Sequence, residues 1–231
     1  MNVVWTGRFQ GPLGHKPLPK NGATEARHDE SCCGEEVENR RAAVFSGPWV
    51  YLTQVHGSDV IVVDDPQAQA GAVADGAVTG LRDIALVIAT ADCAPIALSG
   101  IDSSGAEAFI GAVHAGWKGL QAGVVEEAVL QMQKLGAQKV TARLGPCIHS
   151  ECYEFGEEGL QKFVDLWGSG VRGTTPAGAS SFNLPAAVGI VCERIGVELL
   201  DVAAACTACS GEHFSYRAQQ TPDRQVMVVS R

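Results

Sequence analysis

The chain has 231 residues, of which 46% are hydrophobic and 19% charged, a composition typical of a globular protein with a sizeable core. Its net charge of −9 argues against general binding of nucleic acid, which normally uses a basic surface. No apolar run is long enough to span a membrane, and residues 1–14 lack the features of a secretory signal, so we expect a cytoplasmic protein. Its eight cysteines are therefore expected to be mainly reduced thiols.

The first half of the chain is rich in short apolar runs that predict strands. Residues 10–34, rich in Gly, Pro and polar residues, predict a loop that ends near Cys32 and Cys33. A helix is expected over residues 35–45, because acidic residues come first and apolar residues follow at helical spacing. Strands are predicted at residues 50–55, 59–63, 77–79, 84–89, 95–99 and 108–113.

The second half of the chain contains the stronger helical patterns. Residues 120–135 predict a helix, with one apolar face formed by Val125, Ala128, Val129, Met132 and Leu135. A strand (140–144), a helix (157–167), a loop (168–181), a helix capped by Asn183 (184–195) and strands (197–203, 225–229) follow. Because several strands precede the first strong helix, the pattern favours an α+β fold over a regular β-α-β alternation. No glycine-rich dinucleotide or nucleotide-phosphate loop is present.

Three reactive side chains stand at expected strand ends: His56, Cys93 and His114. Small residues flank each of them, so a ligand can approach closely. Asp92 and Gln54 stand beside these side chains and can orient them through hydrogen bonds. We therefore expect the three side chains to converge on one site.

The donor types leave three chemistries open for this site. Two imidazoles and a thiolate suit a zinc ion with an open fourth position, which can activate a water molecule. The same groups can form a cysteine–histidine dyad with Cys93 as nucleophile. They can also form a trigonal copper site. The long spacing between His56, Cys93 and His114 does not choose among these possibilities.

A second pattern combines His149-x-Glu151 with Cys206-x-x-Cys209, as in nucleobase deaminases that bind zinc. Deaminases place a proline before the first of these cysteines, where this chain has Ala205, and no helical pattern carries either motif here. We interpret Cys206 and Cys209 as reduced thiols in a loop.

Six motifs in fixed order, from about residue 38 to residue 217, resemble one known family. They are Gln54-Val55-His56-Gly57, Thr90-Ala91-Asp92-Cys93-Ala94-Pro95, Val113-His114-Ala115-Gly116-Trp117-Lys118-Gly119, Gly145-Pro146-Cys147-Ile148 with Cys152-Tyr153-Glu154, Cys206-Thr207, and Phe214-Ser215-Tyr216-Arg217. The family is the bacterial laccase-domain family, also called multicopper polyphenol oxidoreductases or peptidoglycan editing factors. The resemblance implies one laccase-type domain over residues 1–231, folded as a four-layer α/β/β/α sandwich with mixed sheets.

The resemblance also implies an activity and a set of site residues. It implies a zinc ion held by His56, Cys93 and His114, with copper as the alternative. The implied reaction is phosphate-dependent cleavage of adenosine, inosine, guanosine and methylthioadenosine, together with deamination of adenosine. Asp92, Cys93 and His114 are then the expected catalytic residues. Gln54, Lys118 and Arg217 are the expected substrate-binding residues, with the two cations facing phosphate.

The chain departs from the family at both ends. After Arg217 the family continues with a second arginine and an Asp-Gly, where this chain has Ala218 to Gln220 and then Pro222-Asp223-Arg224. Near the N-terminus only Arg8 and the residues before it resemble the family's opening.

Two other enzymatic functions stay open beside the phosphorylase. One is a metal-free hydrolase of cell-wall peptides with Cys93 as nucleophile. The other is a copper phenol oxidase. The chain has six histidines and no His-x-His pair, which is few for such an enzyme. A metal-stabilised binding module is a further option. The expected partners are a purine nucleoside and phosphate, and the expected state is a monomer.

Overall fold

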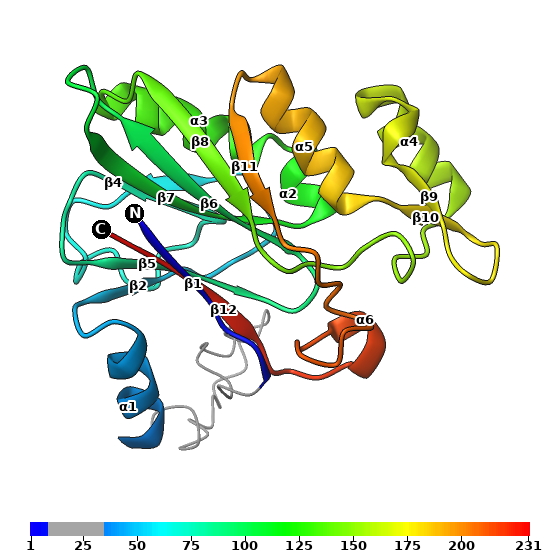
Figure 1. Ribbon diagram of the computed structural model, residues 1–231, viewed down its shortest axis with the longest axis horizontal. Helices are drawn as coiled ribbons and strands as arrows, with labels where there is room; N and C mark the ends of the chain where they lie inside the picture. The colour runs from blue at the N-terminus through cyan, green and yellow to red at the C-terminus, as the bar shows by residue number, and fades with distance from the viewer. Residues whose placement is uncertain (9–34) are drawn as a thin grey trace.

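Two mixed β-sheets, lying face to face, organise the chain in a computed structural model that describes residues 1–8 and 35–231 (Figure 1). The expected loop at 10–34, with Cys32 and Cys33, lies outside the described residues. The six-stranded sheet has the order β11-β8-β6-β7-β4-β3, and the four-stranded sheet has the order β1-β12-β5-β2. Each sheet contains parallel and antiparallel pairs, so the expected α+β class with mixed sheets is confirmed.

The elements have the following bounds. The larger sheet contains β3 (Val60–Val62), β4 (Gly76–Thr79), β6 (Ala94–Ile101), β7 (Glu107–Ala115), β8 (Lys139–Leu144) and β11 (Glu198–Val202). The smaller sheet contains β1 (Asn2–Trp5), β2 (Trp49–Tyr51), β5 (Ala85–Thr90) and β12 (Gln225–Ser230), and a hairpin contains β9 (Arg172–Thr174) and β10 (Ser180–Phe182). The helices are α1 (Glu35–Val44), α2 (Trp117–Gln121), α3 (Val124–Leu135), α4 (Glu157–Trp167), η3 (Ser169–Val171), α5 (Leu184–Arg194) and α6 (Tyr216–Gln219).

The central strand β6 shows why the sequence folds in layers. Side chains alternate between the two faces of a strand, and β6 is apolar on both. Ile96 and Leu98 pack into the core between the larger sheet and helices α3, α4 and α5. Ala97 packs into a second core, between the two sheets, with Leu86 and Ile88 of β5. Figure 1 shows α3 and α5 on one side of the larger sheet and the smaller sheet on its other side.

The smaller sheet is covered on its outer face by the segment that contains α1. Ala85 and Val87 of β5 pack there against Val44 and Phe45, at and just after the end of α1. This helix lies where the sequence predicts one.

The helix predicted over residues 120–135 is instead two helices, α2 and α3. The chain breaks between them because Gly123 has a φ of 88°, a left-handed conformation that glycine adopts readily. The predicted apolar face is correct within α3, since Val125, Ala128, Val129 and Met132 are buried, while Leu135 is half-buried against the same core.

Three other stretches differ from the prediction. Residues 168–181, predicted as a loop, contain η3 and the hairpin β9–β10. The short elements β1 and α6 were not expected.

The predicted helix cap at Asn183 is confirmed, since its side chain accepts a hydrogen bond from the backbone N–H of Ala186 at 3.1 Å. Within the described ranges, no helix has the length and apolar character needed to cross a bilayer.

Candidate functional site

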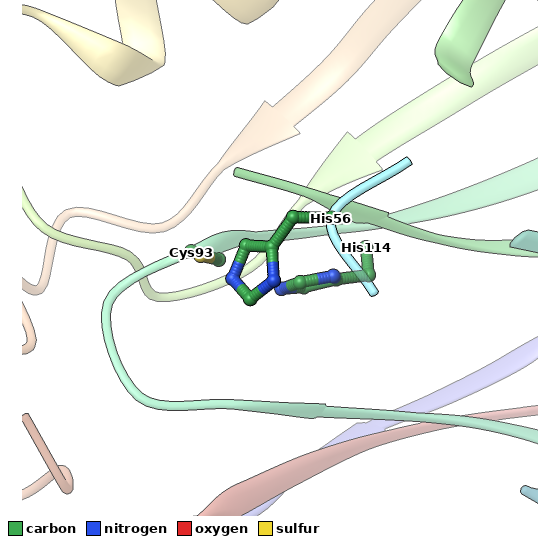
Figure 2. Close-up of side chains that lie close together, drawn as sticks. All are labelled: His56, Cys93 and His114. Atoms are coloured by element: carbon green, nitrogen blue, oxygen red, sulfur yellow. The ribbon is translucent and has the colours of Figure 1, made fainter. Parts of the chain in front are cut away.

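His56, Cys93 and His114 lie together in the structure (Figure 2). Their donor atoms are all within 4.8 Å of one another, and the two imidazole rings meet nearly edge to face. The pairing of β6 with β7 explains this convergence, because it sets Pro95 opposite His114 and so places Cys93 beside that histidine. His56 reaches the same place from the turn between β2 and β3.

Asp75 is the residue that holds the two histidines in position, and sequence reasoning did not find it. Its carboxylate is fully buried and accepts hydrogen bonds from the backbone N–H groups of Val55, His56 and Gly57, at 3.2, 2.9 and 2.6 Å. It also lies 2.7 Å from Nδ1 of His114. Burial alone raises the pKa of Asp75, but hydrogen bonds from His114, Gly57 and His56 outweigh it, so the pKa is lowered.

This hydrogen bond fixes how His114 presents its ring. An ionised carboxylate only accepts, so Nδ1 of His114 carries a proton towards Asp75. The other nitrogen, Nε2, is then the one left for a ligand. Carboxylates support metal-binding histidines in this way in many proteins.

Cys93 and His114 stabilise each other's charged forms. Burial raises the pKa of Cys93, but His114 and His56 outweigh it and bring the pKa down to about 6. Burial lowers the pKa of His114, but Cys93 and Asp75 raise it to about 9. The environment therefore favours a thiolate at Cys93, which is the form that binds metals or acts as a nucleophile.

The backbone is strained at two positions of the site. His56 has a φ of 63° and Asp92 a φ of 101°, both in the region that residues with a side chain rarely adopt. Such conformations cost about 1–3 kcal/mol each and cluster at functional sites. Each of these two residues stands in a turn that brings a ligand-bearing segment to the site.

The donor set and its surroundings fit a zinc ion. Gly116, at the start of α2, leaves room beside the sulfur: a Cβ there would come within 2.9 Å of Sγ of Cys93 and 3.1 Å of Cδ2 of His56. Two imidazoles and one thiolate make the three-ligand set of an open zinc site, and Asp75 supplies the supporting carboxylate. His56 is exposed, so the site is open on one side.

Asp92 is tied to the protein through both of its carboxylate oxygens. One accepts a hydrogen bond from Oγ1 of Thr207, and the other accepts one from the backbone N–H of Arg217, both at 2.7 Å. The carboxylate therefore joins the loop that carries Cys93 to two later segments of the chain. This arrangement is suited to a positioning role, and the catalytic role expected of Asp92 stays a prediction.

A cavity of about 610 Å³ opens beside the three side chains, a size suited to a small organic ligand. Its walls are rich in aromatic residues and carry two arginines. They are formed by Tyr51, Leu52, Thr53, Gln54, His56, Gly71, Ala89, Thr90, Ala91, Asp92, Cys93, His114, Trp117, Tyr153, Tyr216, Arg217 and Arg224.

Gln54 lines this cavity, but its amide is bonded to the protein. Its Nε2 donates to the carbonyl of Ala89, and its Oε1 accepts from the N–H of Ala89, both at 2.9 Å. Gln54 therefore ties the His56 turn to β5.

The cations predicted to bind phosphate differ in position. The Arg217 guanidinium lies 5.0 Å from the ring centroid of Tyr153, donates to the carbonyl of Glu154 at 3.0 Å and lines the cavity. Lys118 is exposed, lies over the ring of Trp117 and is not among the lining residues. Arg224, in the segment where the chain departs from the family, lines the cavity and was missed. Arg8 lies over Phe214, outside the lining.

The fold and the site together define a small α+β protein with a candidate His₂Cys metal centre beside a ligand-sized cavity. Residues 17–231 match the family model described as multi-copper polyphenol oxidoreductase laccase. The chain therefore belongs to this laccase-domain family, as its sequence motifs predict.

Relatives agree with this assignment, and solved structures share the fold. The chain is 39% identical to the purine nucleoside phosphorylase ORF3 of Streptomyces griseus, over 95% of this chain and 88% of the relative. It is also 39% identical to a purine nucleoside phosphorylase of Streptomyces coelicolor, over 95% and 89%. The fold resembles that of a Neisseria meningitidis protein, with a TM-score of 0.76, 24% identity and coverage of 98% and 92%. The hypothetical protein YfiH of Bacillus licheniformis gives a TM-score of 0.74, 22% identity and coverage of 98% and 90%.

Proposed function

We propose that this protein is a zinc-dependent purine nucleoside phosphorylase acting on adenosine, inosine, guanosine and methylthioadenosine, with adenosine deaminase activity. The observation that carries the proposal is the cavity itself, in which a His₂Cys set, aromatic walls and two arginines lie together. The purine nucleoside phosphorylase names of relatives at 39% identity support the same reaction class.

The aromatic walls suit a purine base. Trp117, Tyr153 and Tyr216 line the cavity, and flat rings of this kind stack on a base with little loss of conformational entropy. Tyr153 is further fixed by Arg217 above its ring. We assign the base to this wall.

The arginines suit the phosphate. In phosphorolysis a phosphate oxygen bonds to the anomeric carbon of the ribose as the bond from that carbon to the purine nitrogen breaks. Arg217 and Arg224 can hold the anion in place, because guanidinium groups bind phosphate through paired N–H donors. We assign Arg217 and Arg224 to phosphate binding. We assign Lys118 no direct contact with phosphate.

His56, Cys93 and His114 would hold the metal. When bound, a zinc ion would supply an electrophilic centre, which can polarise the leaving purine in phosphorolysis, and an activated water, which deamination of adenosine requires. Asp75 keeps the proton of His114 on Nδ1, and Asp92 keeps the loop of Cys93 against the segment that carries Arg217. These two carboxylates act through the groups that they position.

A metal-free hydrolase that uses Cys93 is the second candidate. The pairing of Cys93 with His114, which lowers the pKa of the thiol to about 6, is the observation that favours it. The copper oxidase suggested by the name of the family model would use the same three ligands, and metal analysis separates copper from zinc.

The test is the release of adenine from adenosine by the purified full-length protein, with and without phosphate. We expect adenine and ribose 1-phosphate only when phosphate is present, and inosine as the product of deamination. Equal release of adenine without phosphate, or no release in either condition, would refute the phosphorylase. Phenol oxidation that requires added copper would support the oxidase instead.

A further inference from the structure

A second group of thiols lies outside the cavity, where sequence reasoning placed only a loop. Sγ atoms of Cys152, Cys206 and Cys209 are all within 4.8 Å of one another. None of the three residues lines the cavity. All cysteines that the structure describes are free thiols, so no disulfide explains this grouping.

The three thiols come from two segments that the backbone already joins. Cys147 and Cys206 form a β-bridge, and the N–H of Thr207 donates to the carbonyl of Cys147 at 3.0 Å. The N–H of His149 donates to Sγ of Cys206 at 3.4 Å. The site is therefore assembled by the fold and not by the chance approach of flexible side chains.

A fourth donor stands beside the group. Oε1 of Glu151 lies 3.8 Å from Sγ of Cys209 and 3.8 Å from Nδ1 of His149. Cys206 is buried, Cys152 half-buried and Cys209 exposed, so an ion can enter from the side of Cys209. Three cysteines with one further ligand occur in closed sites in which zinc has a structural role, and a carboxylate oxygen is among the donors that zinc accepts.

We propose that Cys152, Cys206 and Cys209 bind a second, structural metal ion of the soft divalent class, such as zinc, with Glu151 as a fourth ligand. Each thiol gives up its proton to solvent as its sulfur bonds to the ion, and no electron is transferred. The ion joins the segment that ends at Tyr153 to the segment that runs from Cys206 to Arg217. Both segments supply walls of the cavity.

The two metal sites would then have different roles. The His56–Cys93–His114 site faces the cavity, and the three-cysteine site joins two of the segments that form its walls. Thr207, next to Cys206, donates to Asp92 and so connects the three-cysteine site to the loop of Cys93. This inference stands whether or not the protein is a phosphorylase, because it depends only on the thiol geometry.

The test uses the full-length protein with three substitutions, Cys32→Ser, Cys33→Ser and Cys93→Ser. The first two remove adjacent thiols outside the described residues, and the third disables the cavity site. Cd²⁺ is the probe, because each cadmium–thiolate bond adds near-ultraviolet absorption. We expect one equivalent to bind, with absorption from three thiolates and a higher melting temperature.

Two added substitutions decide the outcome. Cys209→Ser changes an exposed thiol, so folding should be unaffected, and it should weaken Cd²⁺ binding at least about 100-fold, since loss of outer partners alone costs 10–100-fold. Cys192→Ser removes a thiol of α5 that is not part of the group, so it controls for the loss of one cysteine and should leave binding unchanged. Undiminished binding in Cys209→Ser would overturn the proposal. So would a disulfide among the three cysteines that prevents metal binding in protein purified without reductant.

Discussion

The two groups of metal-binding side chains are built in different ways. His56, Cys93 and His114 stand in strand β7 or in turns next to strands, and the fully buried Asp75 holds two of them in place. Cys152, Cys206 and Cys209 stand in segments outside the main sheets, and the carboxylate nearest to them, Glu151, is partly exposed. The first group lines the cavity of about 610 Å³, and the second group does not.

The difference indicates what each arrangement is suited to do. A catalytic metal needs an open position next to a substrate, and the first group provides one beside aromatic walls and arginines. A structural metal needs enough ligands to exclude substrate and water, and three thiols with a nearby carboxylate approach that condition. Substitutions at the two groups and at their neighbours should therefore differ in their effects on activity and on metal binding.

Replacing Cys93 should have the largest effect on activity. Cys93→Ser removes the thiolate from the cavity site, and a bound metal contributes several kcal/mol to transition-state stabilisation. We expect phosphate-dependent nucleoside cleavage to fall at least about 100-fold. Metal analysis should show loss of one ion per chain, with the ion at Cys152, Cys206 and Cys209 retained. Unchanged activity in Cys93→Ser would contradict the assignment of Cys93 as a metal ligand that the reaction requires.

Replacing Asp75 should have the next largest effect, although it touches no substrate. Asp75→Asn removes the charge that holds the proton on Nδ1 of His114, so we expect metal affinity at the cavity site to fall about 10–100-fold. The change should also destabilise the fold by about 1–3 kcal/mol, because the carboxylate accepts three backbone hydrogen bonds while buried. Competition with a metal chelator and urea unfolding measure the two effects.

Asp102→Asn is the control for Asp75. Asp102 also accepts backbone hydrogen bonds, from Ser104 and Ala106, but it lies in the turn after β6, at the opposite end of that strand from Cys93, and is only half-buried. It should change neither metal affinity nor activity. Equal effects of the two substitutions would show that Asp75 has no specific role.

Adding one methyl group at Gly116 tests the fit around the sulfur. Gly116→Ala would place a Cβ 2.9 Å from Sγ of Cys93, while the φ of −74° at Gly116 allows alanine. Overpacking of this kind costs about 1–3 kcal/mol, so metal affinity should fall about 10-fold. Gly156→Ala is a matched control, because Gly156 also precedes a helix with extended backbone but a Cβ there meets nothing within 4 Å. A chelator titration of the two variants with equal midpoints would contradict the expected crowding.

Replacing Arg217 or Lys118 should have the smallest effects, and the two changes in the KM for phosphate should differ. Arg217→Ala should raise the KM for phosphate about 10-fold, since a hydrogen bond to a charged group contributes about 1.5–3 kcal/mol. Lys118→Ala should change it less than about 2-fold, because an exposed side chain outside the lining has little influence. Steady-state kinetics at varied phosphate distinguish the two. The reverse order would restore Lys118 as the phosphate ligand that its place at the start of a helix suggests.

The sequence predicts the first group because its residues share a recognisable setting. His56, Cys93 and His114 each follow or end an apolar run, and the ends of neighbouring strands meet at one edge of a sheet. Asp75 could not be found in this way, because Asp-Gly pairs are common in turns and nothing in the neighbouring sequence marks Asp75 as part of a site. Its role depends on the pairing of β4 with β7, which sets Gly76 opposite Val113.

The second group and the divided helix show two other limits. The β-bridge between Cys147 and Cys206 brings together the distant segments that carry Cys152 and Cys206, and no periodicity in the sequence predicts that contact. In the divided helix, Gly123 interrupts an apolar pattern that continues across it, so spacing alone indicates one helix where the left-handed glycine makes two. Arg224 was missed because it comes after the last motif shared with the family, although the fold returns it to the cavity.

The central claim is that the metal at His56, Cys93 and His114 is required for phosphate-dependent cleavage of nucleosides. The most direct measurement is a zinc titration of metal-stripped protein carrying Cys209→Ser. This substitution weakens the three-cysteine site, so the zinc that binds is expected at the cavity site. Bound zinc and adenine release from adenosine in phosphate are recorded in the same samples. The account predicts that activity rises in proportion to bound zinc and reaches a plateau at one equivalent per chain. Full activity before zinc is added, or none after one equivalent has bound, would contradict it.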